Sequence, residues 1–260
     1  MNYWRERSKP YIPGQTDVYK VSRSKIELFT QCPRCFWLDA RYKITRPNSP
    51  PFNINKAIDE LFKKEFDVHR KAGTQHPLQI KFDVAAKPYP HKDLDTWREN
   101  FVGVFTLHEL TNLHVFGAVD DVWINEDNEL IVVDYKATAK DKEIIDLGPV
   151  GGWQDSYRRQ MEVYQWLLRA KGHKVSNTGY FVYANGDASK DAFNDIVEFR
   201  TNVFPHQGSD KWVEPTLLKM KECLEGDMPP VGQAAMGGDC DFCTYARSRT
   251  ELTLKALQKP

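Results

Sequence analysis

Two Cys-x-x-Cys pairs near opposite ends of the chain constrain its fold more than any other feature of the sequence. The first pair is Cys32 and Cys35, the second is Cys240 and Cys243, and about two hundred residues separate them. Each pair offers two thiolates at the spacing of a metal site, and four thiolates complete a tetrahedral site. The spacing alone predicts Zn²⁺, and it requires the N- and C-terminal segments to meet in the folded protein.

The cysteine count also bears on the class of protein. Five cysteines in 260 residues are too sparse for a disulfide scaffold. Four unrelated buried thiols are the alternative to a metal site, and the doubled spacing argues against them. Cys223, the fifth, lies among apolar residues at helical spacing and is expected in the core. The sequence has no run of about 18 apolar residues and no apolar segment at its start, so we expect a cytoplasmic protein without membrane partners.

The charge balance excludes one class of nucleic-acid-binding protein. Thirty-six basic residues oppose 36 acidic ones, so the chain does not hold nucleic acid by overall positive charge. The charge is nevertheless uneven, because residues 1–46 carry ten basic and four acidic side chains, a net of +6. Aromatic residues are interleaved there: Tyr3, Trp4, Tyr11, Tyr19 and Tyr42. This pattern suits a strand of nucleic acid, and a solvated surface of no such function is the alternative.

Hydrophobic periodicity predicts an α/β fold. Apolar spacing of three and four residues indicates helices over 54–71, 155–171 and 212–224, and Ser24-x-x-Glu27 has the spacing of a helix-capping box. Strands are expected over 78–84, 104–110, 113–124, 129–138, 177–183 and 195–203, with a short helix over 94–100. Pro33 should begin a new helix with Cys32 at its start.

The candidate chemistry lies on a predicted hairpin. Alternation puts Asp134 and Lys136 on one face of a strand that follows an apolar run. If the turn is centred on Asp127, Asp120 lies directly opposite Asp134, and two opposed carboxylates repel each other unless a cation lies between them. Oxygen ligands favour Mg²⁺ or Mn²⁺. A salt-bridged hairpin edge is the plainer explanation of an Asp-x-Lys triplet alone.

These motifs together resemble a known family. Gly117-x-x-Asp120, then Asp134-x-Lys136, then Gln160-x-x-x-Tyr164 is similar to the PD-(D/E)XK nucleases of the RecB type, which include the CRISPR-adaptation nucleases. The resemblance extends to both ends of the chain. It includes the N-terminal pattern of Ser24 followed eight residues later by Cys32-Pro33, and the C-terminal Cys240-Asp-Phe-Cys243. The resemblance implies a restriction-endonuclease-like core, a central mixed β-sheet flanked by helices, with the terminal segments joined at a four-cysteine metal site.

The resemblance also implies roles for individual residues. Asp120 and Asp134 would bind the catalytic metal with the Tyr135 carbonyl, and Lys136 would act on the water or the scissile phosphate. Gln160 and Tyr164, one helical turn apart, would support the site and contact DNA; core packing is the alternative for Tyr164. Asp121 points to the opposite face and is expected to be structural.

The chain departs from the family pattern at two places. Where relatives often carry a metal-binding histidine on the early helix, this sequence has Asp59, a candidate third oxygen ligand or a solvated helix residue. His69 lies on another face of that helix and does not replace it. Relatives hold an iron–sulfur cluster with one N-terminal and three C-terminal cysteines, so a [4Fe-4S] cluster is expected here by resemblance and Zn²⁺ is the alternative.

The expected organisation is a basic arm over 1–23, a nuclease domain over 24–239 and a C-terminal cysteine motif with a helix over 240–260. The expected function is Mg²⁺- or Mn²⁺-dependent hydrolysis of DNA, as an exonuclease on single strands or ends, in repair, recombination or defence. No Gly-x-x-x-x-Gly-Lys motif occurs, so a helicase or a CRISPR or repair protein would be a separate partner. The alternative is a non-catalytic DNA-binding or assembly subunit that retains the nuclease fold.

Overall fold

The computed structural model describes residues 9–47, 53–234 and 237–258, which form two compact units. The terminal unit combines the two ends of the described chain with residues 107–115, and the central unit contains residues 53–106 and 116–210. Residues 1–8, which include Tyr3 and Trp4 of the predicted basic arm, lie outside the described residues. No helix among the described residues is long and apolar enough to cross a membrane.

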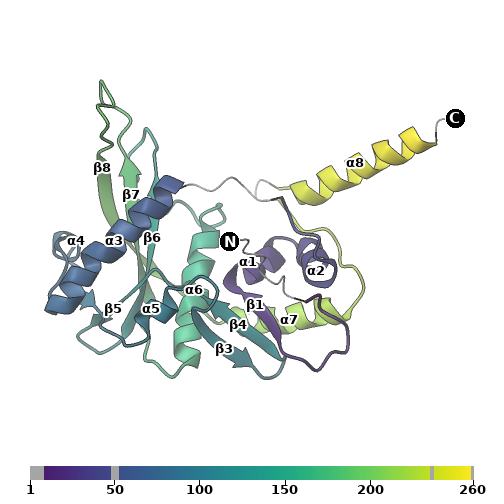
Figure 1. The fold of residues 1–260 in the computed structure, drawn as a ribbon, viewed down its shortest axis with the longest axis horizontal. Coiled ribbons are helices and arrows are strands. Elements are labelled where there is room, and N and C mark those ends of the chain that lie inside the picture. Colours follow the sequence, from purple (N-terminus) through teal and green to yellow (C-terminus); the bar gives the residue numbers. More distant parts are fainter. Residues whose placement is uncertain (1–8, 48–52, 235–236, 259–260) are drawn as a thin grey trace, which may run out of the picture. The chain divides into compact units, whose positions relative to one another are not determined.

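A five-stranded mixed sheet is the framework of the central unit (Figure 1). Its strands run in the order β2-β5-β6-β7-β8, and β6 and β7 are parallel while the other neighbours are antiparallel. The strands are β2 (Ala86–Pro88), β5 (Asp121–Asn125), β6 (Leu130–Thr138), β7 (Thr178–Gly186) and β8 (Phe199–Gln207). The helices of this unit are α3 (Asn53–Ala72), α4 (Pro77–Lys81), α5 (Leu94–Trp97) and α6 (Asp155–Ala170). The mixed α/β architecture predicted from the sequence is confirmed.

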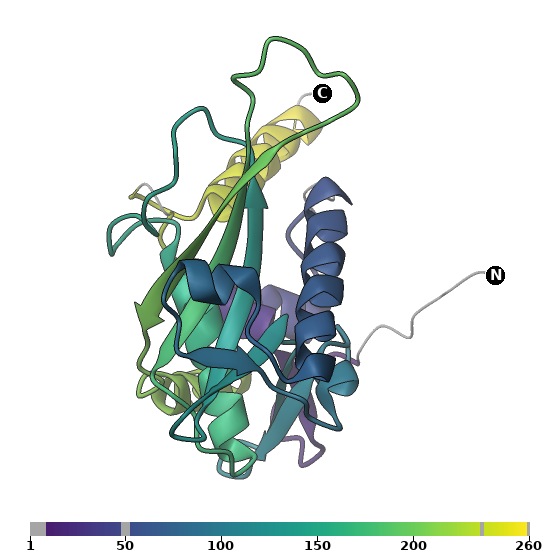
Figure 2. The same cartoon turned by 90° about the vertical axis from the view of Figure 1, so that its left-hand side faces the viewer.

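The long helix α3 covers one face of this sheet (Figure 2). Phe62 and Phe66 of α3 pack in one buried cluster with Trp123 of β5 and with Val133 and Tyr135 of β6. Because side chains alternate along a strand, Asp134 and Lys136 of β6 emerge on the opposite face. That second face is the one that α6 reaches, since Gln160 of α6 donates a hydrogen bond to Asp134.

The terminal unit is mainly helical. It contains α1 (Arg23–Gln31), α2 (Pro33–Tyr42), α7 (Val213–Glu225) and α8 (Asp241–Leu257). A three-stranded sheet has the order β1-β4-β3, with β1 (Tyr19–Ser22), β3 (Val104–His108) and β4 (Leu113–Gly117), and residues 107–115 are the part of β3 and β4 that belongs to this unit. As predicted, Pro33 begins a helix, and Cys32 is its N-cap residue. Pro at the first helical position lacks the N–H that would have no partner there, so α2 can begin directly after α1.

Three local expectations were wrong. Residues 77–81 form helix α4 and not a strand, because Pro77 begins the helix between His76 and Gln79, whose side chains form a capping box. The predicted strand over 113–124 is broken at residues 118–120, and its halves β4 and β5 belong to different sheets. No capping box forms at Ser24, since α1 already begins at Arg23 without a side-chain cap.

Candidate active site and cysteine centre

The β5–β6 hairpin has the register predicted from a turn centred on Asp127. Asp121 pairs with Val133 and Val122 with Val132, so the position opposite Asp134 is that of Asp120. Asp120 lies one residue before β5 begins, and the backbone N–H of Tyr135 donates a 2.9 Å hydrogen bond to its Oδ2 atom. This hydrogen bond holds the Asp120 carboxylate against β6, beside Asp134.

Asp134 and Lys136 form an ion pair on this face of the sheet. Asp134 is fully buried and accepts a 2.8 Å hydrogen bond at Oδ1 from Gln160 Nε2, while the lysine side chain is 15% exposed. Burial and the charge of Asp134 raise the pKa of Asp120 to about 7, although Lys136 opposes this shift. Two carboxylates that share one lysine leave an excess of negative charge in a buried place, which favours a cation.

Gln160 and Tyr164 extend the site along α6. Gln160 Nε2 lies 3.3 Å from the Tyr164 hydroxyl and also donates to Asp134, so one amide group links the tyrosine to the carboxylate. Tyr164 is buried and Gln160 is partly exposed. The structure thus brings Asp120, Asp134, Lys136, Gln160 and Tyr164 together in the central unit.

Asp59 lies on α3 within electrostatic range of Asp120. Burial and the charge of Asp120 raise the pKa of Asp59. Its Oδ2 atom accepts a 2.7 Å hydrogen bond from Lys63, and its Oδ1 atom is buried without a hydrogen-bond partner among the described residues. A buried carboxylate oxygen without a donor suits a hard cation, so the donor set fits Mg²⁺ or Mn²⁺. Asp59, Asp120 and Asp134 do not, however, form a compact group of three ligands among the described residues.

Asp121 belongs to a separate network on the other face, as predicted from alternation. Its carboxylate is fully buried and is paired with Arg70 and Arg98, and it accepts a 2.7 Å hydrogen bond from the Tyr135 hydroxyl. The two arginines were not identified from the sequence. A signal was present, because Arg70 continues the apolar stripe of Phe62 and Phe66 at four-residue spacing, and an arginine there requires a buried carboxylate.

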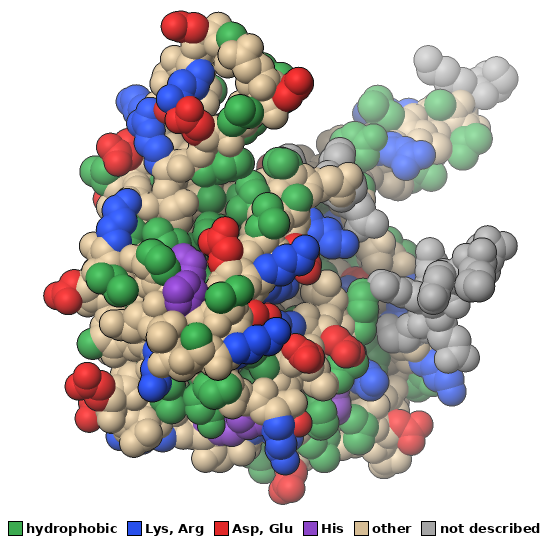
Figure 3. Space-filling model, turned by 60° about the vertical axis from the view of Figure 1, so that its left-hand side comes forward, with side chains coloured by type: hydrophobic (Ala, Val, Ile, Leu, Met, Phe, Trp, Pro, Cys, Tyr) green, Lys and Arg blue, Asp and Glu red, His purple; other side chains and the backbone are tan. Residues whose placement is uncertain are grey.

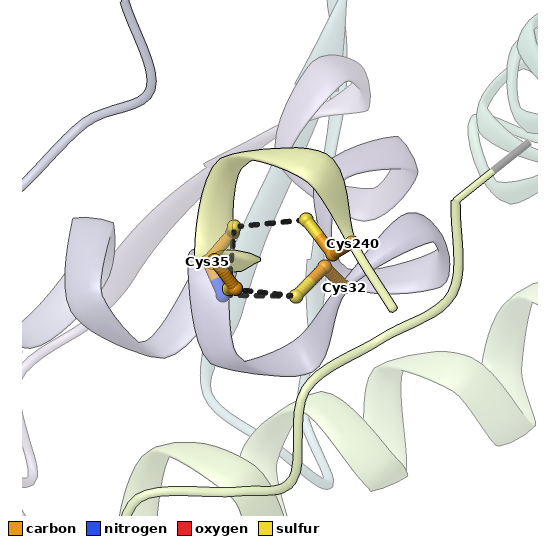
Figure 4. Close-up of side chains that lie close together, drawn as sticks. Cys32, Cys35 and Cys240 are labelled. Atoms are coloured by element: carbon orange, nitrogen blue, oxygen red, sulfur yellow. Dashed lines mark hydrogen bonds between the residues drawn. The ribbon is translucent and has the colours of Figure 1, made fainter. Parts of the chain in front are cut away.

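The four cysteines converge in the terminal unit, as the spacing required (Figure 4). Their sulfur atoms all lie within 4.8 Å of one another, with Cys32 to Cys243 at 3.7 Å, Cys35 to Cys240 at 3.8 Å and Cys35 to Cys243 at 3.6 Å. Cys223 is not a member of this group.

Hydrogen-bond donors surround these sulfur atoms. The backbone N–H groups of Cys35 and Gly232 donate to Cys32 Sγ over 3.4 and 3.2 Å. Burial raises the pKa of Cys35 and of Cys243, whereas at Cys32 these donors outweigh burial and lower the pKa to about 7, which favours the thiolate at that position. Arg46 adds a positive charge, with Nη2 3.4 Å from Cys240 Sγ. The geometry and the donors fit a bound metal.

The fold, with Asp120, Asp134 and Lys136 gathered on one face of its central sheet, is that of a class of nuclease-type hydrolase, and comparison with known proteins identifies the family. The family model described as the PD-(D/E)XK nuclease superfamily matches residues 20–248. The chain belongs to this superfamily, whose members are nuclease-type hydrolases. No curated protein matches the sequence.

Among solved structures, one distant similarity is to a protein described as "Crystal structure of SSO0001". That protein is 13% identical in sequence to this chain. The match covers 82% of this chain and 80% of that chain, with a TM-score of 0.36.

Proposed function

We propose that the protein is a Mg²⁺- or Mn²⁺-dependent deoxyribonuclease that hydrolyses phosphodiester bonds at the Asp120–Asp134 site. The observation that carries the proposal is the placement of two carboxylates side by side with a lysine ion-paired to one of them. An ordinary salt bridge explains the pairing of Asp134 with Lys136. It does not explain why the Asp120 carboxylate lies beside them, or why Asp59 Oδ1 is buried with no hydrogen-bond partner among the described residues.

The residues have distinct roles in this proposal. Asp120, Asp134 and the Tyr135 carbonyl hold the divalent ion, and Asp59 is the candidate third side chain. A bound divalent ion supplies charge to stabilise the developing phosphate and lowers the pKa of an attacking water. Lys136 holds its ammonium group beside the same carboxylate, where it orients the water or neutralises the phosphate oxygen. Gln160 fixes Asp134 Oδ1 by its hydrogen bond, so that Oδ2 faces the lysine.

The preferred substrate in this proposal is single-stranded DNA or a DNA end, cleaved by an exonuclease in repair, recombination or defence. The support is the resemblance to the RecB type and the uneven charge of residues 1–46. On the face seen in Figure 3, Lys and Arg side chains are interspersed with Asp and Glu. Contacts to DNA should therefore be local, and strongly dependent on salt.

One assay tests the catalytic claim. Single-stranded DNA is incubated with Mg²⁺ or Mn²⁺ and with wild-type, Lys136→Ala or Lys174→Ala protein. Lys174 is the matched control, because its side chain is 63% exposed in the central unit and pairs with Glu129 on the surface. We expect cleavage by the wild type and by Lys174→Ala, and a loss of at least ~100-fold in Lys136→Ala. DNA binding without cleavage by the wild type would support the non-catalytic alternative.

We further propose that the cysteine centre holds one Zn²⁺ ion and not the [4Fe-4S] cluster that the resemblance implies. Zn–S bonds of about 2.3 Å place the corners of a tetrahedron about 3.8 Å apart. The three sulfur separations of 3.6 to 3.8 Å match that edge. In a four-iron cluster each thiolate binds a different iron, so the sulfur atoms lie farther apart.

Metal analysis of protein purified without oxygen tests this assignment. We expect about one zinc per chain and no visible absorbance, with the zinc lost in Cys240→Ser and retained in Cys223→Ser. Four irons per chain with a brown colour would contradict it.

A further inference from the structure

Basic and aromatic side chains alternate in a row that leads away from Asp134. The Lys136 Nζ atom lies 4.6 Å from the centre of the Tyr157 ring. That ring meets Trp153 edge to face, with 5.2 Å between centroids and 80° between planes. Lys140 Nζ lies 5.4 Å from the centre of the Trp153 ring. The row therefore connects the candidate active site to a second cation through two aromatic rings.

The loop that carries Trp153 is held in place by one arginine. The Arg158 guanidinium donates to the carbonyl oxygens of Leu147, Gly148 and Pro149, and it also forms an ion pair with Asp155. The Ser156 hydroxyl donates a 2.9 Å hydrogen bond to the Trp153 carbonyl. A ring on a loop fixed in this way binds with little loss of conformational entropy.

Lys140 has a fixed backbone as well. The Lys140 N–H donates to Asn185 Oδ1 over 2.8 Å, and Asn185 Nδ2 donates to the Lys140 carbonyl oxygen over 3.1 Å. Asn185 belongs to β7, next to β6 in the sheet. Asn185 near the end of β7 therefore holds the Lys140 backbone in place, while the lysine side chain is exposed.

Core packing does not explain the position of Trp153. Its side chain is 50% exposed, and Val150 and Ile145 on the same segment are 86% and 76% exposed. An exposed tryptophan flanked by a lysine is a surface on which an unpaired base stacks while the ammonium group contacts the adjacent phosphate. Bases within a duplex have both faces covered by their neighbours, so this surface selects unpaired nucleotides.

We propose that Trp153 is a base-stacking platform and that Lys140 binds a neighbouring phosphate, so that the site takes a strand with an unpaired base near the scissile bond. This inference rests on the proposed nuclease function and specifies how its substrate is held. Trp153 and Lys140 determine specificity, and Tyr157, whose ring contacts both Lys136 and Trp153, positions the tryptophan. None of the three takes part in hydrolysis itself.

Scanning an oligonucleotide with a single abasic site tests the platform. Fluorescein-labelled thymidine oligonucleotides, each with one abasic position, are bound to wild-type, Trp153→Leu and Trp153→Phe protein with Ca²⁺ in place of Mg²⁺. In the wild type we expect one abasic position to weaken binding by roughly 5- to 150-fold, since base–aromatic stacking is worth about 1–3 kcal/mol. Trp153→Leu should bind the intact strand more weakly by the same factor, and its binding should no longer depend on the position of the abasic site. Trp153→Phe should retain that dependence.

A second comparison isolates the lysine. Lys140→Ala should weaken binding and reduce its salt dependence, while Lys142→Ala, two residues along the same exposed segment, should not. The same abasic profile in Trp153→Leu as in the wild type, or equal effects of the two lysine substitutions, would overturn the proposal. Cleavage by the wild type under Mg²⁺ is measured in parallel. Its absence would refute the proposed nuclease, whereas cleavage with an unchanged abasic profile would refute the platform alone.

Discussion

The carboxylate site and the cysteine centre both gather like charges, but the surrounding residues differ in how far they neutralise them. At the cysteine centre, backbone N–H groups and Arg46 already donate to the sulfur atoms, and three of the separations between the four sulfur atoms, 3.6 to 3.8 Å, match the edge of a tetrahedral zinc site. At the carboxylate site, Asp120 and Asp134 share one lysine, and Asp59 keeps an oxygen without a donor among the described residues. A closed set of ligands stabilises a fold, whereas an open one leaves room for water and substrate.

The largest effect is expected at the open site. Asp134→Asn should lower kcat by ~1,000-fold or more, because it removes a proposed metal ligand and the partner of Lys136. The melting temperature should change by no more than about 3 °C, since the loss of the ion pair is offset by reduced repulsion from Asp120. Enzyme kinetics and thermal unfolding of the same preparation check both values. A large fall in melting temperature would mean that Asp134 serves the fold.

The opposite pattern is expected at the closed site. Cys240→Ser should destabilise the terminal unit by about 5 kcal/mol or more, because structural zinc contributes ~10–16 kcal/mol of folding free energy in small domains. Specific activity of the molecules that remain folded should change less. Urea unfolding is compared with Cys223→Ser, whose sulfur lies outside the group. Equal stability of the two variants would show that the four thiols hold no metal.

Asp121 provides a further comparison, because it is adjacent to Asp120 in sequence but is neutralised by ion pairs with Arg70 and Arg98. Asp121→Asn leaves Arg70 and Arg98 buried without their carboxylate, and it should destabilise the protein by about 3–5 kcal/mol. DNA cleavage by the folded fraction at low temperature should persist, which separates this variant from Asp134→Asn. Denaturant titration and kcat measured below the unfolding range test the contrast. A stable but inactive variant would place Asp121 among the functional residues.

The smallest effect is expected for the hydrogen bonds around Glu225 in the terminal unit, which do not depend on a metal. Glu225 accepts hydrogen bonds from Lys221, Tyr11 and the Gly14 N–H, and these partners lower its pKa from 4.5 to about 2. The stabilisation is present above pH 4.5 and is lost as the pH falls towards 2, because only the carboxylate makes these contacts. Partial exposure limits it to about 1 kcal/mol. Stability measured against pH should lose this component in Glu225→Gln.

Local sequence signals predicted some elements well and missed others for identifiable reasons. The helices α3 and α6 follow from periodicity, since each buries one continuous face, and the hairpin register follows from the turn centred on Asp127. Helix α4 was missed because the apolar alternation of residues 78–84 outweighed the cap at His76 and Pro77. The break between β4 and β5 follows from no local residue preference, because it depends on the two halves pairing with different sheets.

The sequence by itself identified the candidate residues for the chemistry: the two Cys-x-x-Cys pairs, the opposed Asp120 and Asp134, and Lys136 on the same strand face. These follow from spacing and alternation, which are properties of the chain alone. Only the tertiary structure decided what surrounds each charge. Arg70 and Arg98 neutralise Asp121, and Trp153 stands exposed beside Lys140. The reason is that neutralisation and exposure depend on partners distant in sequence, which local patterns do not specify.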